Sequence, residues 1–220
     1  MFPLHFRSGH LFIEIMGDLW LFDTGSPMSF GTVPALSLEG IEFNLSDNYM
    51  GLTVETLSSF VTVECAGLLG VDILGNFDFL MDTLNGNVEL AQSELDFTGN
   101  SLALDEFMGI PIVTTFIQGK KYRMFFDTGA QISYFQHDSI TEFPYSGEVT
   151  DFYSGFGQFQ TKTYEIDICL GEADFTLSCG SLPGLLGGTL MMGGVEGIIG
   201  NQVLKDRRFG YFPRRKLLVL

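Results

Sequence analysis

Two aspartates in this sequence occupy the same short motif, 104 residues apart. Residues 22–26 read Phe-Asp-Thr-Gly-Ser and residues 126–130 read Phe-Asp-Thr-Gly-Ala, which places Asp23 and Asp127 in equivalent positions. Two carboxyl groups held close together cannot both ionise easily, so they share one proton and offer a base and an acid at one place. Such a pair could activate water against an unreactive bond. A single aspartate in a turn is usually a structural cap, but a buried pair is costly and therefore favours a functional role.

Each motif follows two short alternating apolar segments joined by a turn that contains glycine. This pattern is typical of a β-hairpin whose second strand ends at the aspartate. The expected strands are Leu11–Ile15 and Leu19–Phe22 in the first copy, and Ile112–Ile117 and Tyr122–Phe126 in the second.

A second marker follows each motif and shows that the chain is an internal repeat. Residues 67–70 read Gly-Leu-Leu-Gly and residues 197–200 read Gly-Ile-Ile-Gly, and from these points the two halves align without a gap for 24 residues. The motif aspartate precedes the last marker glycine by 47 residues in the first half and by 73 in the second. The second half therefore carries 26 additional residues, which we assign to an apolar, glycine-rich loop at about 180–195.

The repeat predicts two lobes, residues 1–90 and 109–220, joined by a polar linker over residues 91–108. Short helical turns are expected at Val71–Leu74 and Asn201–Leu204. No other segment sustains helical periodicity, whereas Val, Thr, Phe and Tyr alternate throughout. We therefore expect an almost entirely β fold.

Composition excludes several classes of partner. The 220 residues include 27 acidic and 11 basic side chains, and the net charge of −16 opposes binding to nucleic acid or to anionic lipid. Six of the bases fall between residues 205 and 216, which we interpret as a solvated surface. The cysteines and histidines lack metal-ligand spacing, so neither a metal nor an organic cofactor is expected.

The long uncharged stretch from Phe175 to Val195 contains six glycines and Pro183, so we interpret it as a loop rather than a membrane span. The start of the sequence shows no basic region followed by a long apolar run. With an odd number of cysteines as well, these observations favour a cytoplasmic protein without stable membrane insertion.

The paired Asp-Thr-Gly motifs and their markers resemble the aspartic peptidases of the pepsin and retropepsin type, over essentially the whole chain. The resemblance implies an all-β, two-lobed acid-protease fold with pseudo-twofold symmetry and an active-site cleft between the lobes. It further implies a monomer in which two retroviral-protease-like lobes are fused in one chain. Asp23 and Asp127 would be the catalytic dyad of an endopeptidase that acts on polypeptides, with apolar residues preferred around the cleaved bond.

The resemblance also assigns roles to the residues beside the dyad. The hydroxyls of Thr24 and Thr128 would bond across the lobe interface and fix the dyad geometry. Gly25 and Gly129 would let backbone amides approach the carboxylates.

The motifs differ at their last position. The hydroxyl of Ser26 could donate a hydrogen bond to Asp23, which Ala130 cannot offer to Asp127. This difference could bias the position of the shared proton.

Flap hairpins cover the cleft in this family, and each half offers a candidate. In the second half, glycines and aromatics precede an alternating strand; in the first half, a shorter segment lies at a comparable position. The candidate flap residues are Ser154, Gly155, Phe156 and Gly157 in the second half and Tyr49, Met50 and Gly51 in the first.

Two further interpretations stay open at the level of sequence. The same fold could serve as a catalytically silent peptide-binding or interaction module, although both aspartates, threonines and glycines are intact. The chain could also be a processing protease so specific that it ignores general protein substrates.

Overall fold

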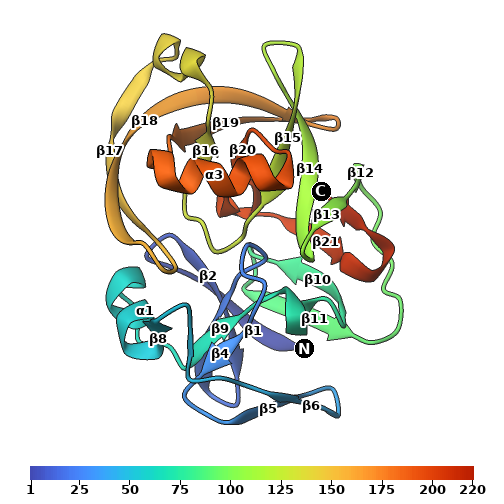
Figure 1. Ribbon diagram of the computed structural model, residues 1–220. Helices are drawn as coiled ribbons and strands as arrows, with labels where there is room; N and C mark the ends of the chain where they lie inside the picture. Colours follow the sequence, from blue (N-terminus) through green and yellow to red (C-terminus); the bar gives the residue numbers. More distant parts are fainter.

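The computed structural model describes the backbone of all 220 residues and every side chain except that of Leu185. The two halves of the chain lie one above the other, each built mostly of β-strands (Figure 1). The expected β character is thereby confirmed.

The first half contains the two predicted hairpin strands, the marker strand and a short helical turn. Its elements are β1 (Phe2–Arg7), β2 (His10–Ile15), β3 (Asp18–Phe22), β4 (Phe30–Gly31), β5 (Ala35–Leu38), β6 (Ile41–Asn44), β7 (Asn48–Tyr49), β8 (Leu52–Thr53), α1 (Val54–Val61), β9 (Gly67–Leu69), α2 (Val71–Leu74), β10 (Asp78–Asp82) and β11 (Asn87–Ala91).

The second half repeats this order with longer strands in its middle and three short 3₁₀ helices, labelled η. Its elements are β12 (Ser101–Ala103), β13 (Asp105–Phe107), β14 (Ile110–Ile117), β15 (Lys120–Phe126), β16 (Ser133–Phe135), η1 (Asp138–Glu142), β17 (Tyr145–Tyr153), β18 (Gly157–Leu170), β19 (Ala173–Gly180), α3 (Gly184–Gly193), β20 (Gly197–Ile199), η2 (Asn201–Leu204), β21 (Arg208–Phe212), η3 (Pro213–Arg215) and β22 (Leu217–Val219).

The strand that leads into each motif pairs in parallel with the marker strand of the same half. β3 pairs with β9, with Phe22 opposite Leu69, and β15 pairs with β20, with Phe126 opposite Ile199. Both marker strands begin with glycine because the backbone of a neighbouring strand is very close. A Cβ on Gly67 would lie 2.2 Å from the backbone oxygen of Phe30. The same distance applies at Gly197. The repeated glycines of the sequence thus reflect the same close approach of strands in both halves.

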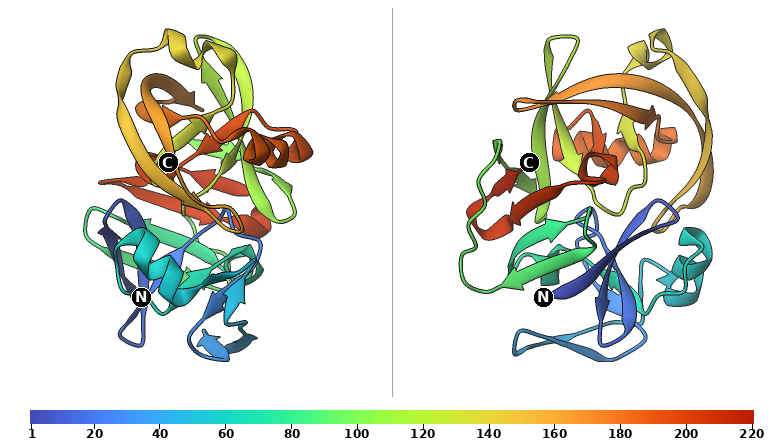
Figure 2. Two further views of the ribbon diagram at one scale, coloured as in Figure 1. Left: turned by 60° about the vertical axis from the view of Figure 1, so that its left-hand side comes forward. Right: turned by 180° about the vertical axis from the view of Figure 1, so that it is seen from behind.

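One sheet joins the halves. Its ten strands run in the order β12-β22-β21-β10-β11-β1-β2-β3-β9-β4, so strands from both halves are neighbours at the pairing of β10 with β21. In Figure 2 the strands of the C-terminal end, in red, lie between the two halves. The second half also has an eight-stranded sheet of its own.

A buried ion cluster stabilises this junction. Asp78, at the start of β10, is fully buried and accepts hydrogen bonds from Arg214 at 2.9 Å and from Arg215 at 2.6 Å. Outside this cluster, Lys216 forms an exposed pair with Glu106 at 3.4 Å, within the second half. Part of the basic cluster, expected to be a solvated surface, therefore connects the two halves of the protein.

The predicted linker, residues 91–108, contains regular structure at its C-terminal end. β12 pairs with β22 and β13 pairs with β14, as β1 pairs with β11 and with β2 in the first half. Both segments end in a tight turn with positive φ, at Ser8-Gly9 and at Met108-Gly109. The second copy of the repeat therefore begins near Ser101 in the structure.

Two helices were not expected from the sequence. α1 and α3 each begin 13 residues before the first marker glycine, and each packs against the face of the motif and marker strands of its half. α1 is capped by Thr53 and buries Val54, Leu57 and Val61. The helical spacing of these three residues could have predicted α1 from the sequence. The alternating apolar residues of the surrounding strands obscured this pattern.

The sequence interpretation of residues 180–195 as an inserted loop was wrong. Gly180 is the last residue of β19, and α3 follows at Gly184–Gly193. This helix is the counterpart of α1 in the first half. Pro183 precedes the first turn of α3 and Gly194 ends the helix in a left-handed conformation, which are ordinary start and stop signals. All 26 additional residues precede α3, where β17, β18 and β19 form long curved strands.

No helix in the described structure has both the length and the apolar character required to cross a membrane. The uncharged stretch 175–195 is divided between β19 and α3.

Candidate active site

The two motif aspartates lie against one another's loops at the junction of the halves. A Cβ placed on Gly25 would lie 2.2 Å from the carboxyl carbon of Asp127, and a Cβ on Gly129 would lie 2.4 Å from that of Asp23. Only glycine fits at either position, because any side chain would overlap with the opposite carboxyl group. The folded chain thus brings Asp23 and Asp127 together from positions 104 residues apart.

The motif threonines form a reciprocal network across the junction. The Thr24 hydroxyl donates to the Phe126 carbonyl at 2.6 Å, and the Thr128 hydroxyl donates to the Phe22 carbonyl at 2.7 Å. Each hydroxyl also accepts the backbone N–H of the other threonine at 3.0 Å. Both side chains are buried, so this network holds the two loops in a fixed register.

Backbone amides of each loop also bind the carboxyl group of the same loop. Gly25 donates to Oδ1 of Asp23 at 2.9 Å, and Gly129 donates to Oδ1 of Asp127 at 2.9 Å. The amide of Ala130 also donates to Asp127, at 3.2 Å. These bonds fix how each carboxyl group is oriented.

The suggested hydrogen bond from the Ser26 hydroxyl to Asp23 is not formed. That hydroxyl donates to the carbonyl of Met28 at 2.8 Å, two residues further along the chain. Local turn geometry offers it a closer backbone acceptor. The serine–alanine difference between the motifs therefore does not distinguish the two carboxyl groups by a side-chain hydrogen bond.

Burial raises the pKa of both aspartates above the ordinary value of 3.8. The pKa of Asp23 is raised well above it, first by burial, then by the negative charge of Asp127, and further by the hydrogen bond between the two carboxyl groups. Two carboxyl groups that lie this close together repel one another when both are ionised, which opposes ionisation of both at once.

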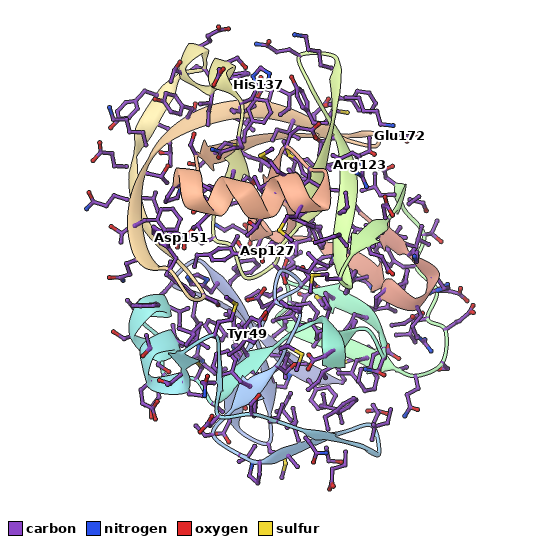
Figure 3. All side chains as sticks on the ribbon, viewed as in Figure 1. Tyr49, Arg123, Asp127, His137, Asp151 and Glu172 are labelled. Atoms are coloured by element: carbon purple, nitrogen blue, oxygen red, sulfur yellow. The ribbon has the colours of Figure 1, made fainter. Side chains whose placement is uncertain are left out.

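Both carboxyl groups open into a cavity of about 290 Å³ lined by residues of both halves. Most of its wall is apolar and aromatic, which is typical of a ligand-binding site. Among the candidate flap residues, Tyr49, Met50 and Ser154 line this cavity, whereas Gly51, Gly155, Phe156 and Gly157 do not. Figure 3 shows Tyr49 below the junction and Asp127 close to it.

The two candidate flaps meet. β17 and β18 form a long hairpin whose tip reaches toward the first half, while β7 and β8 form a very short one (Figure 1). A Cβ on Gly155 would lie 3.1 Å from the terminal methyl of Met50 and 3.8 Å from its carbonyl oxygen. The tips of both hairpins therefore touch beside the cavity.

Helix α3 forms part of the cavity wall. Thr189, Leu190 and Met192 line it, and Leu186 packs behind them in the apolar cluster of the second half. This helix therefore both lines the cavity and packs against the strands of the second half. The Leu185 side chain lies outside the part of the structure that is described.

Sequence reasoning missed two residues that position the second motif loop. The Nδ1 atom of His10 is 3.0 Å from the carbonyl oxygen of Gly129, to which it donates, and Asn201 donates to the Thr128 carbonyl at 3.2 Å. Burial lowers the pKa of His10. The equivalent positions in the repeat hold Ile110 and Val71, so no repeated pattern marked either residue.

A third carboxyl group in the cavity was also missed. Asp151, on β17, lines the cavity and accepts a hydrogen bond from the hydroxyl of Tyr134, which lines it too. Tyr134 lies opposite Ile198 on β20, as Phe30 lies opposite Leu68 on β9. The second half thus has a hydroxyl group where the first half has a plain phenyl ring.

Among the residues whose side chains are described, no group of three or more His, Cys, Asp or Glu could hold a metal ion. No protein-family model matches the chain, and a search of curated proteins finds no significant similarity.

Proposed function

We propose that this protein is an aspartic endopeptidase with a two-lobed acid-protease fold, in which Asp23 and Asp127 form the catalytic dyad. The observation that carries the proposal is the reciprocal contact of the two motif loops. Each glycine lies against the other half's carboxyl group, and each threonine bonds to the other half's backbone. A purely structural aspartate in a turn would have no need of an equivalent partner from a distant segment.

The chemistry follows from one proton shared by two carboxyl groups, an arrangement already known for aspartic peptidases. The ionised carboxyl takes a proton from a bound water as the water oxygen attacks the peptide carbonyl carbon. The other carboxyl donates its proton to the carbonyl oxygen, which gives a tetrahedral diol without a covalent bond to the enzyme. As the C–N bond breaks, the nitrogen receives a proton from one carboxyl group, and a diol hydroxyl returns a proton to the other.

The cavity wall supports a polypeptide substrate. Aromatic and aliphatic side chains surround the dyad, and the contacting hairpin tips leave the cavity bordered by β-strands from both halves. An extended peptide presents alternating side chains to such a wall while its backbone can pair with strand edges.

Cleavage of an unfolded protein at mildly acidic pH tests this function. We expect cleavage that pepstatin inhibits and that Asp127→Asn abolishes. The matched control is Asp18→Asn, since Asp18 lies exposed at the other end of the strand that leads to Asp23.

If wild type and Asp127→Asn were equally inert toward unfolded proteins and toward a peptide library, the peptide-binding interpretation would replace this proposal. Cleavage of a few library members without cleavage of general proteins would instead identify a narrowly specific processing protease.

A further inference from the structure

Asp151 is a buried acid that the dyad chemistry does not use. It lies near the end of β17, on the long hairpin of the second half, and only 8% of its surface is exposed. Val149 and Tyr153, two residues to either side, pack on the apolar cluster of the second half, so the Asp151 side chain lies on the inner face of the strand. Figure 3 shows it close to Asp127, beneath α3.

The contacts of Asp151 orient its carboxyl group but include no basic side chain. One oxygen accepts the Tyr134 hydroxyl, and the other accepts the backbone N–H of Phe152 at 2.8 Å. Burial and the charge of Asp151 raise the pKa of Tyr134, so this hydroxyl remains a donor. Both donors are neutral groups, so neither supplies a counter-charge to the carboxyl group.

No basic side chain in the described structure pairs with the Asp151 carboxyl group. Asp151 takes part in none of its ion pairs, and the described residues that line the cavity include no Lys, Arg or His. Burial lowers the pKa of His10 and is the larger effect, although the charge of Asp151 acts to raise it. The negative charge of Asp151 also contributes to raising the pKa of Asp127. The cavity thus contains three carboxyl groups and, among its described lining residues, no basic side chain, in a chain whose net charge is −16.

We propose that Asp151 determines substrate specificity by binding a lysine or arginine side chain of the polypeptide, next to the dyad. This inference rests on the proposed peptide-cleaving function and names the class of residue that its cleft selects. A cationic head placed at Asp151 replaces an uncompensated charge with an ion pair, and its aliphatic stem suits the apolar wall.

The aromatic side chains around Asp151 fit the same ligand. The ring of Phe159 lies 6.2 Å from that of Tyr134 and also lines the cavity. Aromatic faces attract Lys and Arg cations, most strongly where water is excluded. The surrounding negative charge would raise the rate at which basic peptides reach the cleft.

Peptide binding tests the inference independently of catalysis. Extended fluorescent peptides carry lysine, acetyl-lysine or norleucine at each position in turn and are titrated into full-length protein with the Asp127→Asn substitution, which prevents cleavage. At one position we expect lysine to bind at least about tenfold tighter than norleucine, with acetyl-lysine close to norleucine. Adding Asp151→Asn should bring the lysine-to-norleucine ratio close to one.

Two further variants separate charge from fold. Glu148→Gln removes a charge from an exposed position of the same strand and should leave the ratio unchanged. Tyr134→Phe removes the bond that orients Asp151 but keeps the carboxyl group, so it should lower the ratio by less than Asp151→Asn does. A ratio that Asp151→Asn leaves unchanged, or the absence of any lysine preference, would overturn the inference.

The same peptides assayed for cleavage by the wild type distinguish this inference from the proposed function. Cleavage without preference for a basic residue refutes the role of Asp151 alone. Asp151-dependent binding of lysine peptides without any cleavage supports the role of Asp151 and refutes the peptidase.

Discussion

The two halves of this protein are nearly equivalent at their motif loops and differ in the elements that surround the cavity. Both halves present Asp, Thr and Gly in the same loop, with the same hydrogen bonds to the opposite half. Beyond the loops, the first half has a very short hairpin, whereas the second has long curved strands that carry Asp151. The contacts between the two motif loops are therefore matched in both halves, whereas the hairpins beside the cavity are not.

The second motif loop also has more support than the first. His10, from the first half, and Asn201 both donate to backbone oxygens of the second loop. The equivalent residues Ile110 and Val71 have aliphatic side chains that cannot do so. Equivalence of the halves is therefore a property of the two carboxyl groups and their nearest neighbours.

The largest effect should come from removing either acid. Asp23→Asn and Asp127→Asn should each lower kcat/KM by about 10²–10⁴-fold or more, because each removes one partner of the shared proton. Equal losses would support equivalence at the dyad. Steady-state cleavage of one peptide measures kcat/KM for both variants, with Asp18→Asn as the control. A loss of activity in only one of the two variants would contradict the equivalence of the aspartates.

Substitutions at Gly25 and Gly129 test whether the two motif loops are equivalent in their close contacts. Gly25→Ala and Gly129→Ala would each force a methyl group into the opposite carboxyl group, at 2.2 Å and 2.4 Å from its carbon. We expect about a hundredfold loss of kcat/KM in each, since displacements of about 1 Å have effects of that size.

Gly188→Ala is the matched control for these two variants. Gly188 lies in α3 with no neighbouring atom within 4 Å of the added methyl group. Alanine should raise the free energy of unfolding by about 0.5–1 kcal/mol without loss of activity, because glycine is a poor helix former. Retained activity in Gly25→Ala would contradict the contact between the loops.

A smaller effect is expected at the buried ion cluster that joins the halves. Asp78→Ala would leave Arg214 and Arg215 without their shared partner and should lower the free energy of unfolding by about 2–3 kcal/mol. This loss is smaller than for a fully buried pair because both arginines are partly exposed. Urea denaturation measures it.

The control for this variant is Glu106→Gln, which breaks an exposed pair with Lys216. It should change the free energy of unfolding much less, because exposed pairs contribute little. Similar losses in the two variants would contradict a special role for the Asp78 cluster.

The smallest effect concerns how stability depends on pH. The pKa of Asp23 is raised in the folded state, so its contribution to stability is complete below the ordinary value of 3.8 and is lost as the pH rises through the folded pKa. Asparagine does not titrate. Asp23→Asn should therefore have a higher Tm than wild type at neutral pH, and the difference should shrink toward acid.

Asp127→Asn should show the same trend, because the pKa of Asp127 is also raised. Measuring the Tm of both variants between pH 3 and pH 7 tests whether the two aspartates contribute to stability in the same way. A Tm difference that does not change with pH would contradict the raised pKa values.

The sequence alone predicted the repeat, both motif hairpins, and the short turns at Val71–Leu74 and Asn201–Leu204, which the structure has at those residues. These features depend on local patterns: apolar alternation, glycine in turns and spacing repeated in two copies. The helix α3 was misjudged because four of its ten residues are glycine, so that packing of Leu186 and Leu190 rather than propensity stabilises it.

By itself, the sequence determined which residues are equivalent, because an internal repeat is visible without any knowledge of contacts. Only the tertiary structure decided which residues meet: Gly25 with Asp127, Met50 with Gly155, and Tyr134 with Asp151. The physical reason is that these contacts join segments whose separation along the chain carries no periodic signal. The burial and charge of residues at these contacts depend on every segment that surrounds them.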